Sequence, residues 1–194
     1  MNKLSRDDLF SLEAYSVERG RFRERVMAHK VNRRVAIGSN ATLYFEDALT
    51  MQYQVQEMLR IERIFEAAPI QAELDAYNPL IPDGTNLKAT FMLEYPDINE
   101  RHEALAHLMG IEKALWLQVE RGDRIRPVAN EDLERETPEK TSAVHFVRFE
   151  LSSCDINGFR QGGNVRFGID HPEYACEVEL SLETREALAA DLQS

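Results

Sequence analysis

The sequence has few cysteines, and they are poorly spaced for shared chemistry. Only two occur among 194 residues, Cys154 and Cys176, which stand 22 positions apart without a CxxC pair. A disulfide framework needs several paired cysteines, and a structural zinc site needs closely spaced Cys and His ligands. We therefore expect two reduced thiols, no disulfide scaffold and no bound metal.

Long hydrophobic runs and the common catalytic motifs are also missing. No stretch reaches the length of about 18 apolar residues that a membrane helix needs, and residues 1–10 are too charged for a secretory signal. The chain contains neither a GxGxxG nor a GxSxG motif. These absences predict a soluble, cytoplasmic protein with no cofactor, and they give a hydrolase no support.

Positive charge is scarce, and much of it lies at one end of the chain. The net charge is -11, and an acidic surface repels phosphates, so we expect no nucleic-acid binding. Residues 1–34 nevertheless hold nine Lys and Arg against five Asp and Glu, which leaves -15 on the other 160 residues. This basic arm either neutralises the acidic body or docks an acidic partner, and the sequence leaves both readings open.

Length and patterning together predict one α+β domain over 1–194. A chain of this size with 43% hydrophobic residues can bury one continuous core. Residues 1–34 are predicted to form a helical arm that Gly20 interrupts, followed by an α+β body over 35–194. Because strands and helices do not alternate regularly, we expect a mixed, largely antiparallel sheet flanked by helices.

Four segments carry most of the strand signal. A hairpin is predicted at 35–46, and a second one at 114–128. Between them, Leu87, Phe91 and Leu93 alternate with polar residues, which predicts a strand with one buried face. Residues 143–151 are apolar enough for a central strand. The charged segment 130–141 before that strand is predicted to be an exposed loop or lid.

The clearest helix signal runs over 51–66, with Thr50 as its expected N-cap. Its apolar face is predicted from residues at steps of three and four, Met51, Val55, Met58, Ile61 and Phe65. Its polar line is formed by Gln54, Glu57, Arg60, Arg63 and Glu66. Such a line is either a solvated ladder of ion pairs or one wall of a cleft in which Arg60 and Arg63 hold an anionic group.

The remaining site candidates lie on a loop and on two strands. The loop at 77–84 contains two prolines and would present Asn78 and Asp83 in fixed positions, close to Lys88. His145 and Arg148 share the strand at 143–151, where a histidine is more often a hydrogen-bonded core residue than a ligand. His102 and His107 stand five residues apart, so a helix turns them to different faces, and we do not predict that they bind metal.

Four separated segments resemble the bacterial family known as domain of unknown function 3501. They are RRVAIG at 33–38, YQVQEM at 53–58, AYNPLIP at 76–82 and SAVHFVRF at 142–149. The resemblance spans most of the chain. It implies a genomic neighbourhood with a rubrerythrin-like di-iron protein and an iron–sulfur oxidoreductase, but it supplies no catalytic residues.

Two hypotheses about function follow. The first is a non-catalytic accessory protein that contacts a redox partner through the basic arm. The second is a small-molecule enzyme or anion-binding protein with a polar cleft built from Glu57, Arg60, Arg63, Asn78, Asp83 and Lys88. His145 and Arg148 are further candidates for binding a ligand or a partner. A concave pocket in which these side chains converge would favour the second hypothesis. The sequence gives no indication of the oligomeric state.

Overall fold

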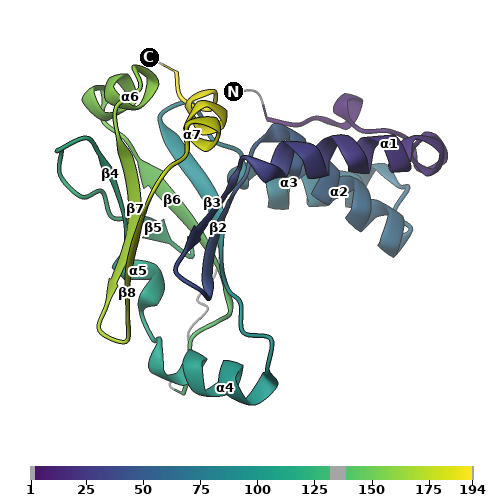
Figure 1. Cartoon of the computed structure of the whole chain (residues 1–194). Coiled ribbons are helices and arrows are strands. Elements are labelled where there is room, and N and C mark those ends of the chain that lie inside the picture. Colours follow the sequence, from purple (N-terminus) through teal and green to yellow (C-terminus); the bar gives the residue numbers. More distant parts are fainter. Residues whose placement is uncertain (1–2, 132–138, 194) are drawn as a thin grey trace.

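The computed structural model describes residues 3–131 and 139–193, and it divides them between a sheet body and a helical lobe (Figure 1). The lobe, made of η1, α1, α2 and α3, extends sideways from the body. In chain order the elements are η1 (Arg6–Asp8), α1 (Leu12–Val31), β1 (Arg34–Ile37), β2 (Ala41–Phe45), α2 (Ala48–Glu62), α3 (Ala67–Tyr77), η2 (Asn78–Leu80), β3 (Asn86–Leu93), α4 (Ile98–His107), α5 (Ile111–Ala114), β4 (Leu115–Val119), β5 (Val128–Ala129), β6 (Val144–Glu150), α6 (Ser153–Arg160), β7 (Val165–His171), β8 (Tyr174–Glu179) and α7 (Leu182–Ala189).

The body contains two sheets that share one core. The first has the strand order β1-β2-β3-β6-β5, the second has the order β4-β7-β8, and all strand pairs among the described residues are antiparallel. Phe167 of the second sheet lies 5.3 Å from Phe45 and 5.5 Å from Phe149 of the first, measured between ring centroids. The predicted α+β class with a helical N-terminal region is confirmed. The prediction of a single domain stays a prediction.

Strand β3 has the two faces that its alternation predicts. Leu87 and Phe91 are fully buried and Leu93 nearly so, whereas Lys88 and Thr90 on the other face are half-buried. The strand lies between β2 and β6, with Phe91 opposite Leu43 on one side and His145 on the other. The period-2 pattern therefore identified the core side of the first sheet correctly.

The helical lobe has two small apolar clusters of its own. Tyr15, Phe22 and Val26 of α1 form one, and Val55 and Leu59 of α2 pack with Leu74 of α3 in the other. Helix α1 continues through Gly20, so the predicted interruption is wrong. Packing of this face against α2 outweighs the modest helix cost of one glycine.

The start and end of α2 both differ from the sequence prediction. Asp47 is the N-cap, and Thr50 is the other half of its capping box. The helix ends at Glu62, and Arg63 adopts a left-handed conformation with φ 56°. The Ile64 amide then donates to the Leu59 carbonyl at 2.9 Å. This turn carries Ile64 onto the second apolar cluster.

The buried face of α2 agrees with the sequence prediction at the start of the helix but not at its end. Ile61 is 62% exposed and Phe65 is 74% exposed. Met51 and Val55 are buried as predicted, and the buried stripe continues through Leu59 and the amide side chain of Gln56. Because α2 meets both α1 and α3, the buried stripe follows those two contacts and leaves the last turn in solvent.

A buried arginine connects the lobe to the body. Arg33, which is 2% exposed, donates to the Phe45, Glu46 and Ala187 carbonyls, at 3.1 Å each. Its guanidinium also pairs with Asp191 and lies 3.5 Å from the Asp47 carboxylate. This single cation therefore joins three segments: the end of α1, the start of α2 and the C-terminal segment after α7.

The second predicted hairpin is only partly present. Leu117 and Ile125 form an antiparallel bridge, but Val128 and Ala129 pair with β6 of the other sheet. Strand β6 thus has neighbours on both sides, as predicted for a central strand. The predicted loop at 130–141 lies largely outside the described residues.

None of the helices in the described ranges is long and apolar enough to cross a membrane.

Candidate functional site

Two site candidates on the helical lobe, Glu57 and Arg60, belong to an ion-pair cluster. Glu57 accepts hydrogen bonds from Tyr15 at 2.7 Å, from Arg19 at 2.8 and 2.9 Å, and from Arg60 at 3.1 Å. The hydrogen bond from Arg19 contributes most to lowering the pKa of Glu57 to about 2. This carboxylate is satisfied by side chains of its own lobe.

The two arginines do not form the predicted pair on one helical face. Arg60 lies on α2, with its side chain 40% exposed, whereas Arg63 follows the helix in the left-handed turn. The prediction of a continuous i, i+3 ladder to Glu66 is therefore wrong, because Glu66 is the N-cap of α3. Neither arginine contributes to the cavity described next.

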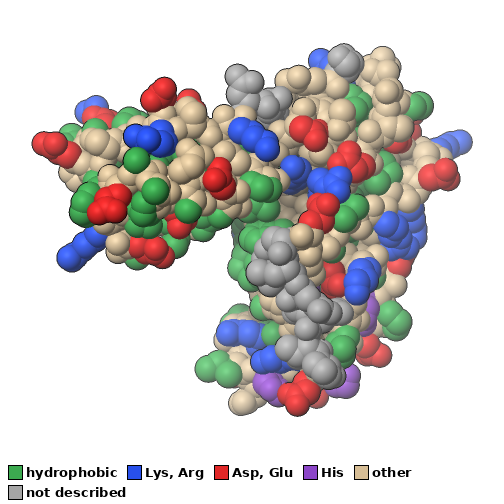
Figure 2. Space-filling view, turned by 180° about the vertical axis from the view of Figure 1, so that it is seen from behind, with side chains coloured by type: hydrophobic (Ala, Val, Ile, Leu, Met, Phe, Trp, Pro, Cys, Tyr) green, Lys and Arg blue, Asp and Glu red, His purple; other side chains and the backbone are tan. Residues whose placement is uncertain are grey.

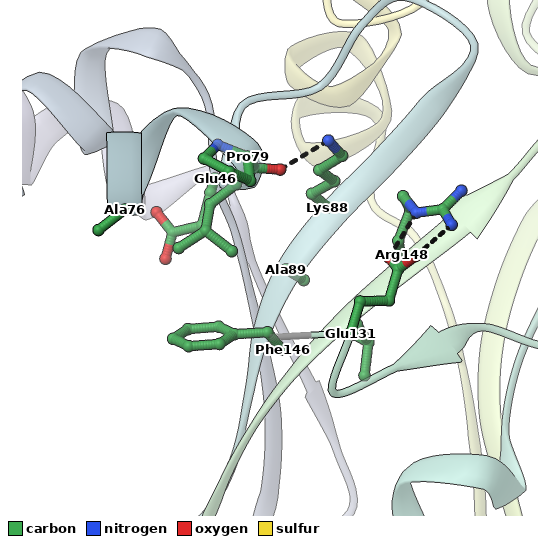
Figure 3. Close-up of a pocket in the computed structure, with 10 residues that line it drawn as sticks. Glu46, Ala76, Pro79, Lys88, Ala89, Glu131, Phe146 and Arg148 are labelled. Atoms are coloured by element: carbon green, nitrogen blue, oxygen red, sulfur yellow. Dashed lines mark hydrogen bonds and ion pairs between the residues drawn. The ribbon is translucent and has the colours of Figure 1, made fainter. Parts of the chain in front are cut away.

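A cavity of about 290 Å³ lies between the first sheet and the end of α3. Hydrophobic side chains gather where the surface is hollowed beneath the helical lobe (Figure 2). We call the cavity of about 290 Å³ the inner cavity. Its lining residues are Glu46, Ala76, Pro79, Leu80, Lys88, Ala89, Glu131, Phe146, Val147 and Arg148. Figure 3 shows the side chains of Glu46 and Phe146 extending towards the Ala76 side, with Lys88 and Arg148 at the opposite side.

The strand register explains why these residues meet. Thr90 of β3 stands between Tyr44 of β2 and Phe146 of β6, and Lys88 stands opposite Arg148. The sheet face that carries Lys88, Thr90 and Phe146 lies opposite the core, because the neighbours of these residues along each strand point inward. The inner cavity is therefore built on the outer face of the first sheet, with α3 and η2 forming its roof.

A second pocket adjoins the inner cavity and is more polar. We call it the outer pocket, and its lining residues are Lys3, Asn78, Pro79, Ile81, Pro82, Asp83, Asn86, Lys88, Glu131, Arg148 and Glu150. Its volume is about 430 Å³, and four of its residues, Pro79, Lys88, Glu131 and Arg148, also line the inner cavity. The structure thus brings together four predicted site residues, Asn78, Asp83, Lys88 and Arg148.

Two cations of this region, Lys88 and Arg148, already have acceptors. The Lys88 ammonium donates to the Pro79 carbonyl at 2.7 Å and to the Ile81 carbonyl at 3.1 Å. Burial lowers the pKa of Lys88. Arg148 donates to both carboxylate oxygens of Glu131 at 2.7 Å, and it also pairs with Glu150. The Glu131 hydrogen bonds raise the pKa of Arg148, so this guanidinium remains charged.

Asn78 and Asp83 serve mainly to shape the loop. The Asn78 side chain accepts from the Leu4 amide at 2.8 Å and donates to the Leu4 carbonyl at 2.9 Å. Asp83 accepts from the Thr85 amide and hydroxyl at 2.9 and 2.8 Å. Burial opposes ionisation of Asp83, but these hydrogen bonds lower its pKa overall. Both residues fix the backbone that forms the roof and rim of the pockets.

His145 lies on the core face of the sheet and does not reach the inner cavity. It is fully buried, with Nδ1 3.0 Å from the Asn130 amide nitrogen and Nε2 2.9 Å from the Ser142 carbonyl oxygen. An imidazole that donates from Nε2 and accepts at Nδ1 satisfies both contacts. The structure therefore gives His145 the hydrogen-bonded core role that was the more common expectation for a strand histidine.

Sequence reasoning missed the residues that give the cavity its character. Glu46 follows β2, is 6% exposed, and accepts from the Thr90 hydroxyl at 2.8 Å. Its Oε2 is buried without a hydrogen-bond partner among the described residues. Phe45 faces the core, so the strand alternation puts Glu46 on the outer face, and the pairing with β3 and β6 brings it beside Thr90 and Phe146.

No set of three His, Cys, Asp or Glu side chains within residues 3–131 and 139–193 is arranged to hold a metal ion. His102 and His107 are both exposed on α4. Cys154 and Cys176 are exposed, free thiols in the structure. The expectation that the protein binds no metal stays a prediction.

Comparison with known proteins identifies close relatives but no activity. The family model described as "Protein of unknown function (DUF3501)" matches residues 3–192. A crystal structure at 1.90 Å resolution, described as a novel protein of unknown function from Burkholderia pseudomallei K96243, superposes with a TM-score of 0.94. The two sequences are 47% identical, and the alignment covers 99% of this chain and 100% of the Burkholderia chain. No curated protein matches the chain.

Proposed function

Because the chain belongs to the DUF3501 family of proteins of unknown function, we propose a function from the site itself: the protein binds a small, partly apolar molecule in the inner cavity. The observation that carries this proposal is the cavity of about 290 Å³ with a polar pocket beside it. Small-molecule sites are concave, mostly apolar and equipped with a few convergent polar groups. The inner cavity and the outer pocket together have this composition.

The position of the cavity supports the same proposal. Its floor is the outer face of a paired sheet, and its roof is the end of α3 together with Pro79 and Leu80 of η2. Because the floor and roof are already rigid, little conformational entropy of the protein is lost when a ligand binds. The proposed site differs from the cleft expected around Arg60 and Arg63, and it retains the expected contribution of Lys88 and Arg148.

Blocking the cavity provides the first test. Ala76 is exposed on α3 and lines the inner cavity, so the indole of Ala76→Trp is expected to occupy the ligand volume. We expect at least about a tenfold loss of affinity for any metabolite that the parent protein retains from a cell extract, because the ligand and the indole compete for one space. Native mass spectrometry identifies the metabolite, and calorimetry measures the loss.

A matched variant controls for the added aromatic group. Ala68→Trp places the same side chain at an exposed position of the same helix, away from the lining residues. We expect its ligand affinity to equal that of the parent protein. Equal retention by Ala76→Trp and Ala68→Trp, or no retention by the folded parent protein, would contradict binding in the inner cavity.

A second candidate function is contact with a protein partner through the helical lobe. Two exposed apolar side chains, Ile61 and Phe65, lie at the α2–α3 turn beside Arg60 and Arg63. Apolar residues flanked by guanidiniums are typical of interface centres, and an acidic partner surface would complement them. The accessory role beside a redox system, implied by the family resemblance, would use this surface.

Replacing both arginines tests the partner hypothesis. We expect Arg60→Gln combined with Arg63→Gln to abolish capture of a redox partner from the native host. We also expect the melting temperature to remain nearly unchanged, because exposed ion pairs contribute little to stability. The readout is affinity capture with the intact protein, compared with Lys140→Gln at an exposed lysine outside α2 and α3. Undiminished capture of the same partner by the double variant would exclude this surface.

A further inference from the structure

Glu46 is the polar side chain of the inner cavity whose hydrogen bonding is incomplete. Its side chain extends from the end of β2 into the cavity (Figure 3). Oε1 accepts from the Thr90 hydroxyl at 2.8 Å, whereas Oε2 is buried and meets no donor among the residues that the structure describes. A buried carboxylate oxygen without a donor is costly, since it has lost its hydration without replacement.

The neighbouring cations do not satisfy this oxygen. The Arg33 guanidinium donates to the backbone carbonyl of Glu46 and pairs with Asp191. Lys88 donates to two loop carbonyls, and Arg148 pairs with Glu131. All three therefore have other acceptors, and a donor for Glu46 Oε2 has to come from the contents of the cavity.

We infer that the ligand of the inner cavity carries a protonated amine, which donates to Oε2 of Glu46, and an apolar body that lies against Phe146 and the roof residues Pro79 and Leu80. This assignment rests on the proposed function and adds the chemical class of the ligand. An ammonium group supplies both the missing donor and the charge that compensates a buried carboxylate. The neighbouring Phe146 ring offers an additional attraction for a cation.

The same geometry disfavours an anionic ligand. An anion in the inner cavity would meet the Glu46 carboxylate at one side, and at the other it would have to displace Glu131 from Arg148 or the loop carbonyls from Lys88. Each displacement breaks an existing charge-assisted hydrogen bond. A cationic amine requires no such exchange.

Three probes of similar size separate these possibilities. Calorimetry with 2-phenylethylamine, 2-phenylethanol and phenylacetate compares a cation, a neutral molecule and an anion on nearly the same apolar body. We expect the intact protein to bind the amine at least about tenfold more tightly than the other two, as a hydrogen bond to a charged group implies. Similar affinities for all three probes, or no binding of the amine, would overturn the inference.

Glu46→Gln provides the decisive variant because it keeps the shape of the side chain and removes its charge. We expect it to weaken binding of 2-phenylethylamine by about tenfold or more and to change binding of 2-phenylethanol by less than about twofold. If thermal melting shows that Glu46→Gln is unfolded, Glu46→Asp replaces it as the test. Aspartate keeps the charge, but its shorter side chain moves the carboxylate away from the ligand by one methylene. The same selective loss is then expected. Unchanged amine affinity in the folded variant would overturn the assignment of Glu46.

The two proposals fail in different ways. Loss of metabolite retention in Ala76→Trp, together with equal affinity for the three probes, would uphold the cavity and refute the amine. Absence of any retained metabolite and of any probe binding would refute both proposals. Amine-selective binding that depends on Glu46 and is blocked by Ala76→Trp is the result that both predict.

Discussion

Arg33→Met is expected to lower the free energy of unfolding by about 3 to 5 kcal/mol, the usual cost of removing one partner from a buried ion pair. The variant leaves the Asp191 carboxylate, whose side chain is 4% exposed, without its cation. It also deprives the Phe45, Glu46 and Ala187 carbonyls of a donor. Urea denaturation of the purified protein measures the loss.

The adjacent arginine provides a matched control. Arg34 is exposed and lies with its guanidinium carbon 5.7 Å from the centroid of the Tyr44 ring, so Arg34→Met is expected to cost about 1 kcal/mol or less. Combining Arg33→Met with Asp191→Asn should recover part of the lost stability, because the unpaired charge is then removed. Equal stability of Arg33→Met and Arg34→Met would show that Arg33 does not hold the lobe to the body.

The pH dependence of Arg33→Met gives the same network a second readout. Burial raises the pKa of Asp191 from 3.8 to about 6, although Arg33 opposes the shift. A carboxyl group with a raised folded pKa takes up its proton more readily in the folded state, so its contribution to stability falls as the pH rises from about 4 through 6. Without Arg33 this pKa rises further. The deficit of the variant should therefore be larger at about pH 7.5 than at about pH 5.

The role of Arg33 illustrates what a local sequence pattern cannot reveal. In the sequence it is one of several arginines in a basic arm, indistinguishable from Arg34. In the structure its guanidinium meets Asp191, 158 positions away, and the backbone of β2. Arg33 pairs with Asp191 near the C-terminus, and Arg19 pairs with Glu57 of the same lobe. The neutralising role of the arm as a whole stays a prediction. Which cations are buried depends on long-range packing.

The contrast between β3 and α2 has the same cause. A strand in the middle of a sheet has one core face, so alternation alone assigned Leu87, Phe91 and Leu93 correctly. Helix α2 contacts two different helices and ends early in a left-handed turn at Arg63. Ile61 lies in its last turn and Phe65 beyond its end, and both side chains are exposed although periodicity predicted their burial.

The candidate site was predictable only in the parts that are close in sequence. Asn78, Asp83 and Lys88 belong to one loop and the strand that follows it, so their association could be anticipated. Glu46 and Thr90 are 44 positions apart, and their contact requires the β2–β3 register. The feature that most directly suggests a ligand class is therefore the one that depends most on the tertiary fold.

Phe91→Ala is expected to have the second large effect, a loss of about 3 to 5 kcal/mol in the free energy of unfolding. Phe91 is fully buried at the centre of the first sheet, and its ring centroid lies 6.1 Å from that of His145. Truncation removes its apolar contacts and leaves a cavity that neighbours paired on both sides cannot easily fill.

Met92 on the opposite face of β3 distinguishes a core effect from a general effect on the strand. It is half-buried, and Met92→Ala is expected to cost less than half as much as Phe91→Ala, because the outer face can relax into solvent. Chemical denaturation of both variants gives the comparison. The inner cavity lies on the outer face, so Phe91→Ala should retain the ligand at temperatures at which it remains folded. Equal losses for the two variants would mean that the two faces of β3 contribute equally, which contradicts the burial on which the whole site is built.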